Sequence, residues 1–184
     1  MVDECEAVRV GHSYSLAASI VPAGRLASVR AAVTAKTPGN RSKLHWHDAE
    51  TAGRRLQLAE MVAGLDAVEH VVVVLATRAA ERPERRRRRC LGRLLPEPHD
   101  LGVGLVTAEA REPKQNQRDR QFLDGLRAQG RVPASLRLDH RPGPAEPALA
   151  VADIVAGAIL ADRSGDGRYR KVLEHKLTEL VIDP

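Results

Sequence analysis

The sequence predicts an α/β domain built on a mixed β-sheet. The runs HVVVVLA (70–76) and LGVGLVTAE (101–109) are apolar over the length of a strand, as in strands buried on both faces. Stretches with helical periodicity alternate with these runs, which is typical of α/β folds. With 184 residues, 43% of them hydrophobic, the chain is long enough for one domain with a sizeable core.

The first third of the chain is expected to hold three strands and two helices. The first two strands follow each other closely, so they are predicted to pair antiparallel. Asp48 is the expected N-cap of the second helix. The strands are expected over 2–10, 13–21 and 43–46 (KLHW), and the helices over 22–35 and 48–65.

The rest of the chain alternates between strands and helices. Gly130 and Gly165 mark helix ends, and Pro147 suits a first helical turn. Strands are expected over 70–76, 101–109 and 135–140, and helices over 82–98, 114–130, 147–163 and 167–182. Residues 1–184 are thus predicted to form a single domain, with 164–184 as a C-terminal helical extension.

The charge balance points to a polyanionic partner. The net charge is +5 and the pI is about 9.7, and arginine supplies 24 of the 29 basic residues. Guanidinium groups match phosphate oxygens, so nucleic acid is a plausible partner, although an arginine-rich chain also arises from genome composition. Four aromatic residues are too few for an extended base-stacking platform.

Several function classes lack their usual sequence features. The chain has no phosphate-binding glycine loop, no serine elbow and no apolar run of transmembrane length, and GVGLV is only part of a dinucleotide-binding signature. Cys5 and Cys90 have no metal-ligand spacing and form no disulfide framework. The expected compartment is therefore the cytoplasm, without a membrane partner.

Asp153 is the one charged residue in PALAVADIVAGAILA (147–161), a stretch predicted to form a buried helix. A buried carboxylate needs a hydrogen bond, a counter-ion or a metal. Three of its four helical neighbours, Ala150, Ala156 and Gly157, are small, so another element can approach this face closely. An alternative is a structural aspartate paired with an arginine such as Arg137.

Two further acids lie where the fold can bring them to Asp153. Glu109 ends the fifth predicted strand, and ligand-binding groups gather at the carboxyl ends of strands in α/β sheets. Asp3 lies in the first predicted strand, where Glu4 points to the opposite face. Converging carboxylates suit Mg²⁺ or Mn²⁺, which can activate water for phosphodiester cleavage.

The segments that carry these acids resemble a large family of uncharacterised bacterial proteins with a ribonuclease H-like domain of unknown function. VDEC (2–5) is similar to the family's first strand, which bears Asp-Glu-Ser, and LAVADIVAGAI (149–159) is similar to its last helix. TAEAREPKQNQRDRQFLDGLR (107–127) and SKLHWHD (42–48) resemble two further family segments, so the likeness spans most of the chain.

The resemblance implies a ribonuclease H-like sheet with helices on both faces and a divalent-metal-dependent nuclease activity. It makes Asp3, Glu109 and Asp153 the catalytic, metal-binding acids, with Glu4 and Asp119 close by. The fourth predicted strand ends without an acid, and Glu50, in the helix after the third predicted strand, is a candidate to replace it. Ribonuclease H carries its strand-end acid on the fourth strand, whereas Glu109 falls on the fifth predicted one.

Basic side chains near these acids are candidate phosphate ligands. They are Lys43, Lys114, Arg118 and Arg120. The run Arg85–Arg89 covers more than one helical turn and is expected to be a solvated face. The alternative function is a non-catalytic module of the same fold that binds nucleic acid, a protein partner or a second copy of the chain.

The histidines offer a weaker alternative. His45 and His47 would share one face of the short third strand, which is a possible start of a zinc site. His99 and His140 are the other histidines considered as ligands, but neither has an obvious position beside them. Surface histidines held by hydrogen bonds are the simpler expectation.

Overall fold

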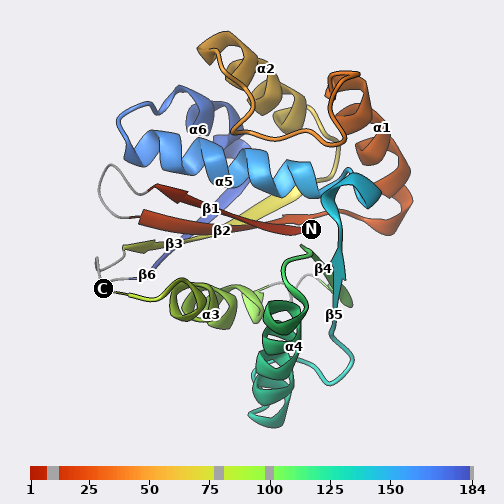
Figure 1. Cartoon of the computed structure of the whole chain (residues 1–184), viewed down its shortest axis with the longest axis vertical. Coiled ribbons are helices and arrows are strands. Elements are labelled where there is room, and N and C mark those ends of the chain that lie inside the picture. The colour runs from red at the N-terminus through yellow and green to blue at the C-terminus, as the bar shows by residue number, and fades with distance from the viewer. Residues whose placement is uncertain (8–12, 77–80, 98–101, 183–184) are drawn as a thin grey trace.

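A computed structural model describes residues 1–7, 13–76, 81–97 and 102–182 of the chain. Six strands form one mixed sheet in the order β5-β4-β1-β2-β3-β6 (Figure 1). The structure confirms the predicted α/β class and the mixed sheet. The strands are β1 (Val2–Ala7), β2 (Ser13–Ile20), β3 (Glu69–Ala76), β4 (Leu105–Glu109), β5 (Arg137–Arg141) and β6 (Leu177–Ile182).

The middle of the sheet is an antiparallel meander and its two sides are parallel. β1 pairs antiparallel with β2, as predicted, and β2 pairs antiparallel with β3. β4 lies parallel to β1 and β5 lies parallel to β4, while β6 lies parallel to β3 on the other side. The Val2↔Ala108 pairing places Asp3 level with Glu109.

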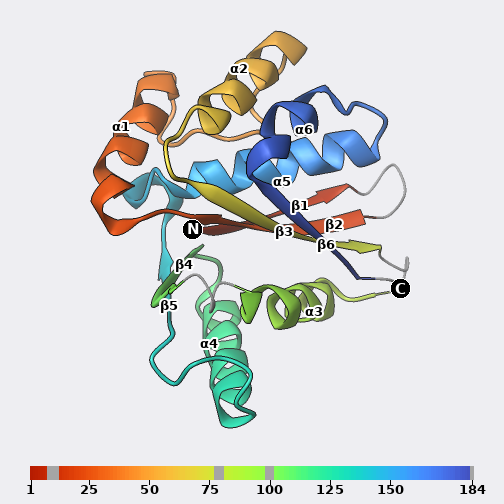
Figure 2. The same ribbon diagram turned by 180° about the vertical axis from the view of Figure 1, so that it is seen from behind.

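Helices cover both faces of the sheet, as Figures 1 and 2 show from opposite sides. α3 and α4 lie on one face and the remaining helices lie on the other. The first group is α3 (Pro83–Leu94) and α4 (Pro113–Ala128). The second group is α1 (Leu26–Lys36), α2 (Ala52–Ala63), α5 (Leu149–Arg163) and α6 (Arg168–Leu173).

Each face of the sheet has its own hydrophobic core. On one side, α5 packs directly on β1 and β2, and its residues from Leu149 to Leu160 are all buried. On the other side, α3 and α4 contribute Cys90, Leu91 and Leu123 to the second core. Since this stretch of α5 is buried all round, the one carboxylate within it, Asp153, must be satisfied inside the protein.

The third predicted strand and the predicted N-cap are wrong. Residues 43–46 form turns and loop, and Leu44 and Trp46 enter the core from that loop. α2 begins later than expected, and its N-cap is Thr51, whose side chain accepts a hydrogen bond from the Arg54 backbone, rather than Asp48. Without a strand at 43–46, Glu109 ends the fourth strand among the residues that the structure describes.

The predicted C-terminal helix is only half right. α6 and a short 3-10 turn end at Lys176, and the following residues form β6, which pairs with β3 from His70 to Leu75. The sequence LTELVI is therefore an edge strand of the main sheet, and the segment from 164 onward is not a purely helical extension.

None of the helices in the described part of the chain is long and apolar enough to cross a membrane. The most apolar of them, α5, has 15 residues, whereas a spanning helix needs about 20.

Candidate functional site

Three acids from distant segments converge on the α5 side of the sheet. Asp3 comes from β1, Glu109 ends β4 and Asp153 comes from the middle of α5. All three line one small hollow. The lining also includes Lys43, Leu44, His45, Gly143, Pro147, Leu149 and Ala150. The structure therefore brings together the three acids that the sequence singled out.

Asp153 is 7% exposed and is held by the loop that precedes α2. Its Oδ2 accepts a 2.7 Å hydrogen bond from the backbone N–H of Trp46 and lies 3.1 Å from Nδ1 of His45. Both contacts are made to Oδ2, so one oxygen of this carboxylate is partnered by the loop. Arg137, the alternative partner considered from the sequence, is an exposed residue of β5.

The small residues of α5 allow this loop to come close. A Cβ atom on Gly157 would overlap the ring of Trp46, which packs edge-on to Tyr169 with ring centroids 5.1 Å apart. Ala156 lies against β2, where its carbonyl accepts a 3.3 Å hydrogen bond from Ser15 Oγ. The close approach predicted from Ala150, Ala156 and Gly157 is therefore confirmed for the last two residues.

Glu109 is paired with Lys43 from the same loop. Lys43 Nζ donates to Glu109 Oε1, and both side chains are mostly buried. Gly143 lies against this pair, since a Cβ there would come within 2.6 Å of Glu109 Oε1. A side chain at this position would have to displace the Lys43 and Glu109 side chains, so the segment before α5 packs directly against the ion pair.

The crowding of carboxylates changes the protonation of the site. Burial, followed by the charges of Asp153 and Glu109, raises the pKa of Asp3 well above its usual range. The hydrogen bond with Asp153 raises the pKa of His45, which burial alone would lower. A group of like charges in a partly dry site is typical of a functional site, but it also occurs in structural clusters.

The donor set has the right chemistry for Mg²⁺ or Mn²⁺, because both ions prefer carboxylate oxygens. Yet among the residues that the structure describes, no group of three His, Cys, Asp or Glu side chains is arranged to hold a metal ion. Lys43 and His45 instead occupy oxygens of Glu109 and Asp153. A metal ion at these acids would compete with both basic side chains for these oxygens.

Glu4 and Asp119 belong to a second cluster on the opposite face of the sheet. Arg87 of α3, only 4% exposed, joins them: its Nη1 donates to Glu4 at 2.7 Å and its Nη2 donates to Asp119 at 2.9 Å. Tyr14 donates to Glu4, and Arg111 donates to Asp119 at 3.1 Å. The two acids are therefore near each other but are not part of the Asp3 site.

This second cluster is electrostatically balanced. Burial alone would raise the pKa of Asp119, but the hydrogen bond from His140 and the charges of Arg87 and Arg111 lower it to about 2. Burial opposes the charge on Arg87, yet Glu4 and Asp119 outweigh it and raise the pKa of its guanidinium. The cluster ties β1, α3, α4 and β5 together.

The remaining predicted site residues lie outside the hollow. Glu50 is exposed before α2, and Lys114 is exposed at the start of α4. Arg120 contacts His140 at 3.4 Å, and Arg118 lines a different cavity between α3 and α4. Of the four predicted phosphate ligands, only Lys43 is beside the acids.

The zinc alternative finds no support within the described residues. His45 binds Asp153 and His140 Nε2 lies 3.2 Å from Asp119 in the other cluster, while His47 is exposed. Since residues 43–46 form no strand, His45 and His47 do not share a strand face. His99 lies outside the residues that the structure describes.

Two features of the site were not predicted. The pairing of His45 with Asp153 joins segments more than a hundred residues apart, and no sequence pattern indicates it. The burial of Arg87 could have been found, because it lies three, four and seven positions before the buried residues Cys90, Leu91 and Leu94. The run Arg85–Arg89 is therefore not a wholly solvated face.

Comparison of the chain with models of known protein families gives no match, and comparison with curated proteins gives no similar sequence.

Proposed function

We propose that this protein is a divalent-metal-dependent phosphodiester hydrolase with a ribonuclease H-like fold, acting on nucleic acid. The observation that carries the proposal is the convergence of Asp3, Glu109 and Asp153 on one hollow. They come from the first strand, the end of the fourth strand and a late helix, which is the arrangement that the family resemblance implies.

The position of Glu109 supports the ribonuclease H-like assignment. The sequence pattern placed it on a fifth strand, but residues 43–46 are not a strand, and Glu109 ends β4. Ribonuclease H has its strand-end acid at the end of its fourth strand. The antiparallel meander of β1, β2 and β3, with β4 added parallel to β1, agrees with the expected mixed sheet.

The three acids would hold the metal, and Asp3 is the acid whose ionised form the metal would stabilise most. Its carboxylate is disfavoured by burial and by the charges of Asp153 and Glu109, so added positive charge would relieve this repulsion. A bound divalent ion lowers the pKa of a coordinated water and stabilises a leaving oxygen. Lys43, once released from Glu109, is placed to contact a phosphate, and the loop of Leu44 and Trp46 excludes water from one side.

A small diester tests this activity without requiring any wider binding surface. We expect purified protein to hydrolyse bis(p-nitrophenyl) phosphate in Mn²⁺, and Asp153→Asn to lower the rate at least about 100-fold. Asp66→Asn, at an exposed position, is the matched control and should keep the wild-type rate. No hydrolysis of the diester, of DNA or of RNA by wild type in Mn²⁺ or Mg²⁺ would contradict the proposal.

A specific observation favours a second candidate, a non-catalytic nucleic-acid-binding module. Lys43 and His45 already contact Glu109 and Asp153, so one oxygen of each of these two acids has a basic partner. This candidate predicts salt-sensitive binding of nucleic acid with no cleavage, because phosphate contacts release counterions. Binding that persists unchanged in Asp153→Asn, together with inactive wild type, would support it.

A further inference from the structure

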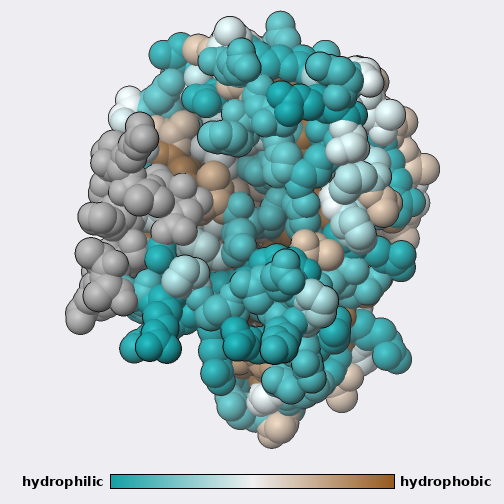
Figure 3. Space-filling view, viewed as in Figure 1, coloured by the Kyte–Doolittle hydropathy of each residue, from teal (hydrophilic) through white to brown (hydrophobic). Residues whose placement is uncertain are grey.

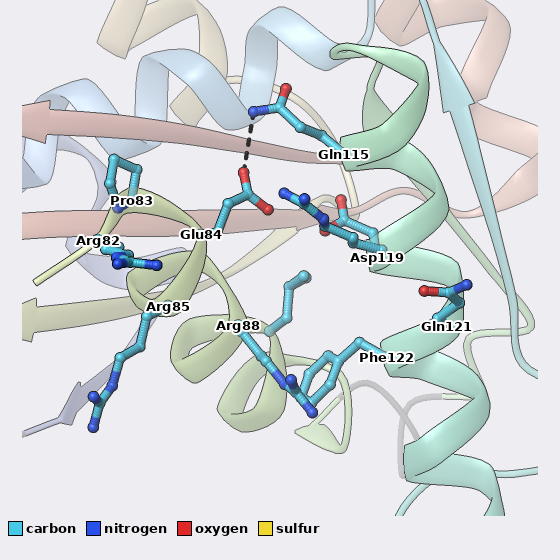
Figure 4. A pocket seen from close by; sticks show the side chains of 11 residues that line it. Arg82, Pro83, Glu84, Arg85, Arg88, Gln115, Asp119, Gln121 and Phe122 are labelled. Atoms are coloured by element: carbon cyan, nitrogen blue, oxygen red, sulfur yellow. Dashed lines mark hydrogen bonds between the residues drawn. The ribbon is translucent and has the colours of Figure 1, made fainter.

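An open cavity of about 880 Å³ lies between α3 and α4, on the face of the sheet opposite the three acids. Figure 4 shows Arg82, Arg85 and Arg88 at its α3 side, and Phe122 at its α4 side. Arg118 of α4 completes a lining with four arginines. Figure 3 shows that the surface over α4 is largely hydrophilic.

The acids of this cavity are already neutralised. Glu84 accepts hydrogen bonds from Arg111 at 2.8 Å and from Gln115 at 3.1 Å, the second of which is drawn in Figure 4. Asp119 is paired with Arg87 and Arg111. The positive charge of the four lining arginines is therefore not cancelled by these two carboxylates.

The arginines themselves have few competing partners. Within the described residues, neither Arg82 nor Arg118 has an ion pair, and both are exposed. Arg85 Nε lies 3.4 Å from Glu81 Oε1, but the Arg85 side chain is 78% exposed. An ion pair with so exposed a partner contributes little to stability. Arg88 stacks over Phe122, 4.8 Å from the ring centroid, which leaves its N–H groups able to donate to a ligand.

The spacing of these charges suits a repeating anion. Arg82 is the N-cap of α3, and Arg85 and Arg88 follow at intervals of three residues on the helix, so the three charges extend over roughly 9 Å at about 1.5 Å per residue. Arg118 faces them from α4. Guanidinium groups on both walls can donate to the phosphates of one strand lying between the helices, and a cavity of about 880 Å³ is too small to enclose a duplex.

The cavity also continues along the same face of the sheet. A second cavity of about 230 Å³ shares Pro83, Glu84 and Gln115 with it and reaches Glu4, Cys5 and Arg111. A strand held between α3 and α4 can thus extend along this face as far as Glu4, whereas Asp3, Glu109 and Asp153 line the hollow on the other face.

We infer that this arginine-lined groove between α3 and α4 binds a single strand of nucleic acid through its phosphates. The choice of ligand rests on the proposed function. The groove provides the length of contact that the small hollow at Asp3 lacks. Its recognition is independent of sequence, because arginine contacts to phosphates carry no base information.

The test is the binding of fluorescently labelled 20-nucleotide oligo(dT) and oligo(U), measured by anisotropy in EDTA over a range of salt. Arg82→Gln/Arg118→Gln removes one charge from each wall and should weaken binding about tenfold or more. Each lost contact should also make the slope of log K against log salt less negative by about 0.7. The matched control, Arg25→Gln/Lys171→Gln, removes two exposed charges from the other face and should bind nearly as wild type does.

Three results would overturn the inference: no binding by wild type at low salt, equal losses in the two double variants, or equally strong competition by polyglutamate or duplex DNA. Hydrolysis of bis(p-nitrophenyl) phosphate separates this failure from failure of the proposed function. Wild type that hydrolyses the diester but binds no oligonucleotide refutes the groove alone. Wild type that binds through the groove but hydrolyses nothing refutes the hydrolase alone.

Discussion

Asp3 and Glu4 are neighbours in β1, but their side chains enter two different charge clusters on opposite faces of the sheet. Asp3 faces Glu109 and Asp153, where negative charge exceeds positive charge and its pKa is raised. Glu4 faces Tyr14 and Arg87, where the acids are matched by arginines. The charges around Asp3 therefore destabilise the folded state, whereas those around Glu4 stabilise it. Substitutions in the two clusters should have opposite effects on stability.

Removing the central cation of the balanced cluster should be costly. Arg87→Met leaves Glu4 and Asp119 without their shared buried partner, and we expect a loss of about 3–5 kcal/mol in the free energy of unfolding. Denaturant unfolding measures it. Arg85→Met, at a side chain 78% exposed, is the control and should change stability by less than about 0.5 kcal/mol. A loss below about 1 kcal/mol in Arg87→Met would show that the cluster does not stabilise the fold.

Asp3→Asn should stabilise the metal-free protein at neutral pH. A carboxyl whose pKa is raised in the folded state favours folding only while it is protonated, so its contribution is present below the usual value near 3.8 and is lost as the pH rises through the raised pKa. Asparagine cannot ionise, so it removes the cost of burying this charge beside Asp153 and Glu109. We expect Asp3→Asn to have a melting temperature a few degrees above that of wild type at pH 7–8. For a chain of this size, about 2–4 °C corresponds to ~1 kcal/mol in the free energy of unfolding.

Asp66→Asn serves as the control for that measurement, because Asp66 is exposed. The advantage of Asp3→Asn over wild type should shrink as the pH is lowered toward 4. A variant less stable than wild type at every pH would mean that the Asp3 carboxylate is a structural requirement.

His45 should give the fold a pH dependence near neutrality. Its pKa is raised by the hydrogen bond with Asp153, so the protonated ring stabilises the fold fully below its usual pKa of about 6.5. That contribution is lost as the pH rises through the raised value. Wild type should therefore lose stability relative to His45→Gln as the pH rises above about 6.5, measured by thermal unfolding, and parallel curves would contradict the pairing.

Gly157→Ala should disturb the loop that holds Asp153. The added methyl group would overlap the ring of Trp46, and such overpacking costs about 1–3 kcal/mol. Trp46 is the one tryptophan of the chain, so a change in its fluorescence reports the displacement directly. Gly125→Ala in α4, where a Cβ meets nothing within 4 Å, should instead be neutral or stabilising by up to about 1 kcal/mol. Equal effects in the two variants would rule out the close contact.

Local patterns in the sequence predict most of the strands and helices, because burial on both faces leaves a clear apolar run in β3 and β4. Local patterns fail where pairing with a segment distant in the sequence determines the secondary structure. LTELVI has leucines at helical spacing after α6, but the free edge of β3 offers a complete set of hydrogen bonds from His70 to Leu75. Tertiary contacts therefore override the local preference.

The same distinction applies to the site. The small residues beside Asp153 predicted a close approach, and the family resemblance singled out Asp3 and Glu109. No local pattern could reveal that Lys43 and His45 would reach these acids, since both lie in an irregular loop whose path depends on how Trp46 packs against α5. Long-range contacts of single side chains leave no periodic signal.

The most direct test of the central claim is the thermal stability of wild type and Asp153→Asn with and without Mn²⁺. A ligand that binds only the folded state contributes about 2.7 kcal/mol at a hundredfold excess over its dissociation constant. We predict that Mn²⁺ raises the melting temperature of wild type by about 5–10 °C and leaves that of Asp153→Asn unchanged. Equal shifts in both proteins, or no shift in either, would contradict a metal site built from Asp3, Glu109 and Asp153.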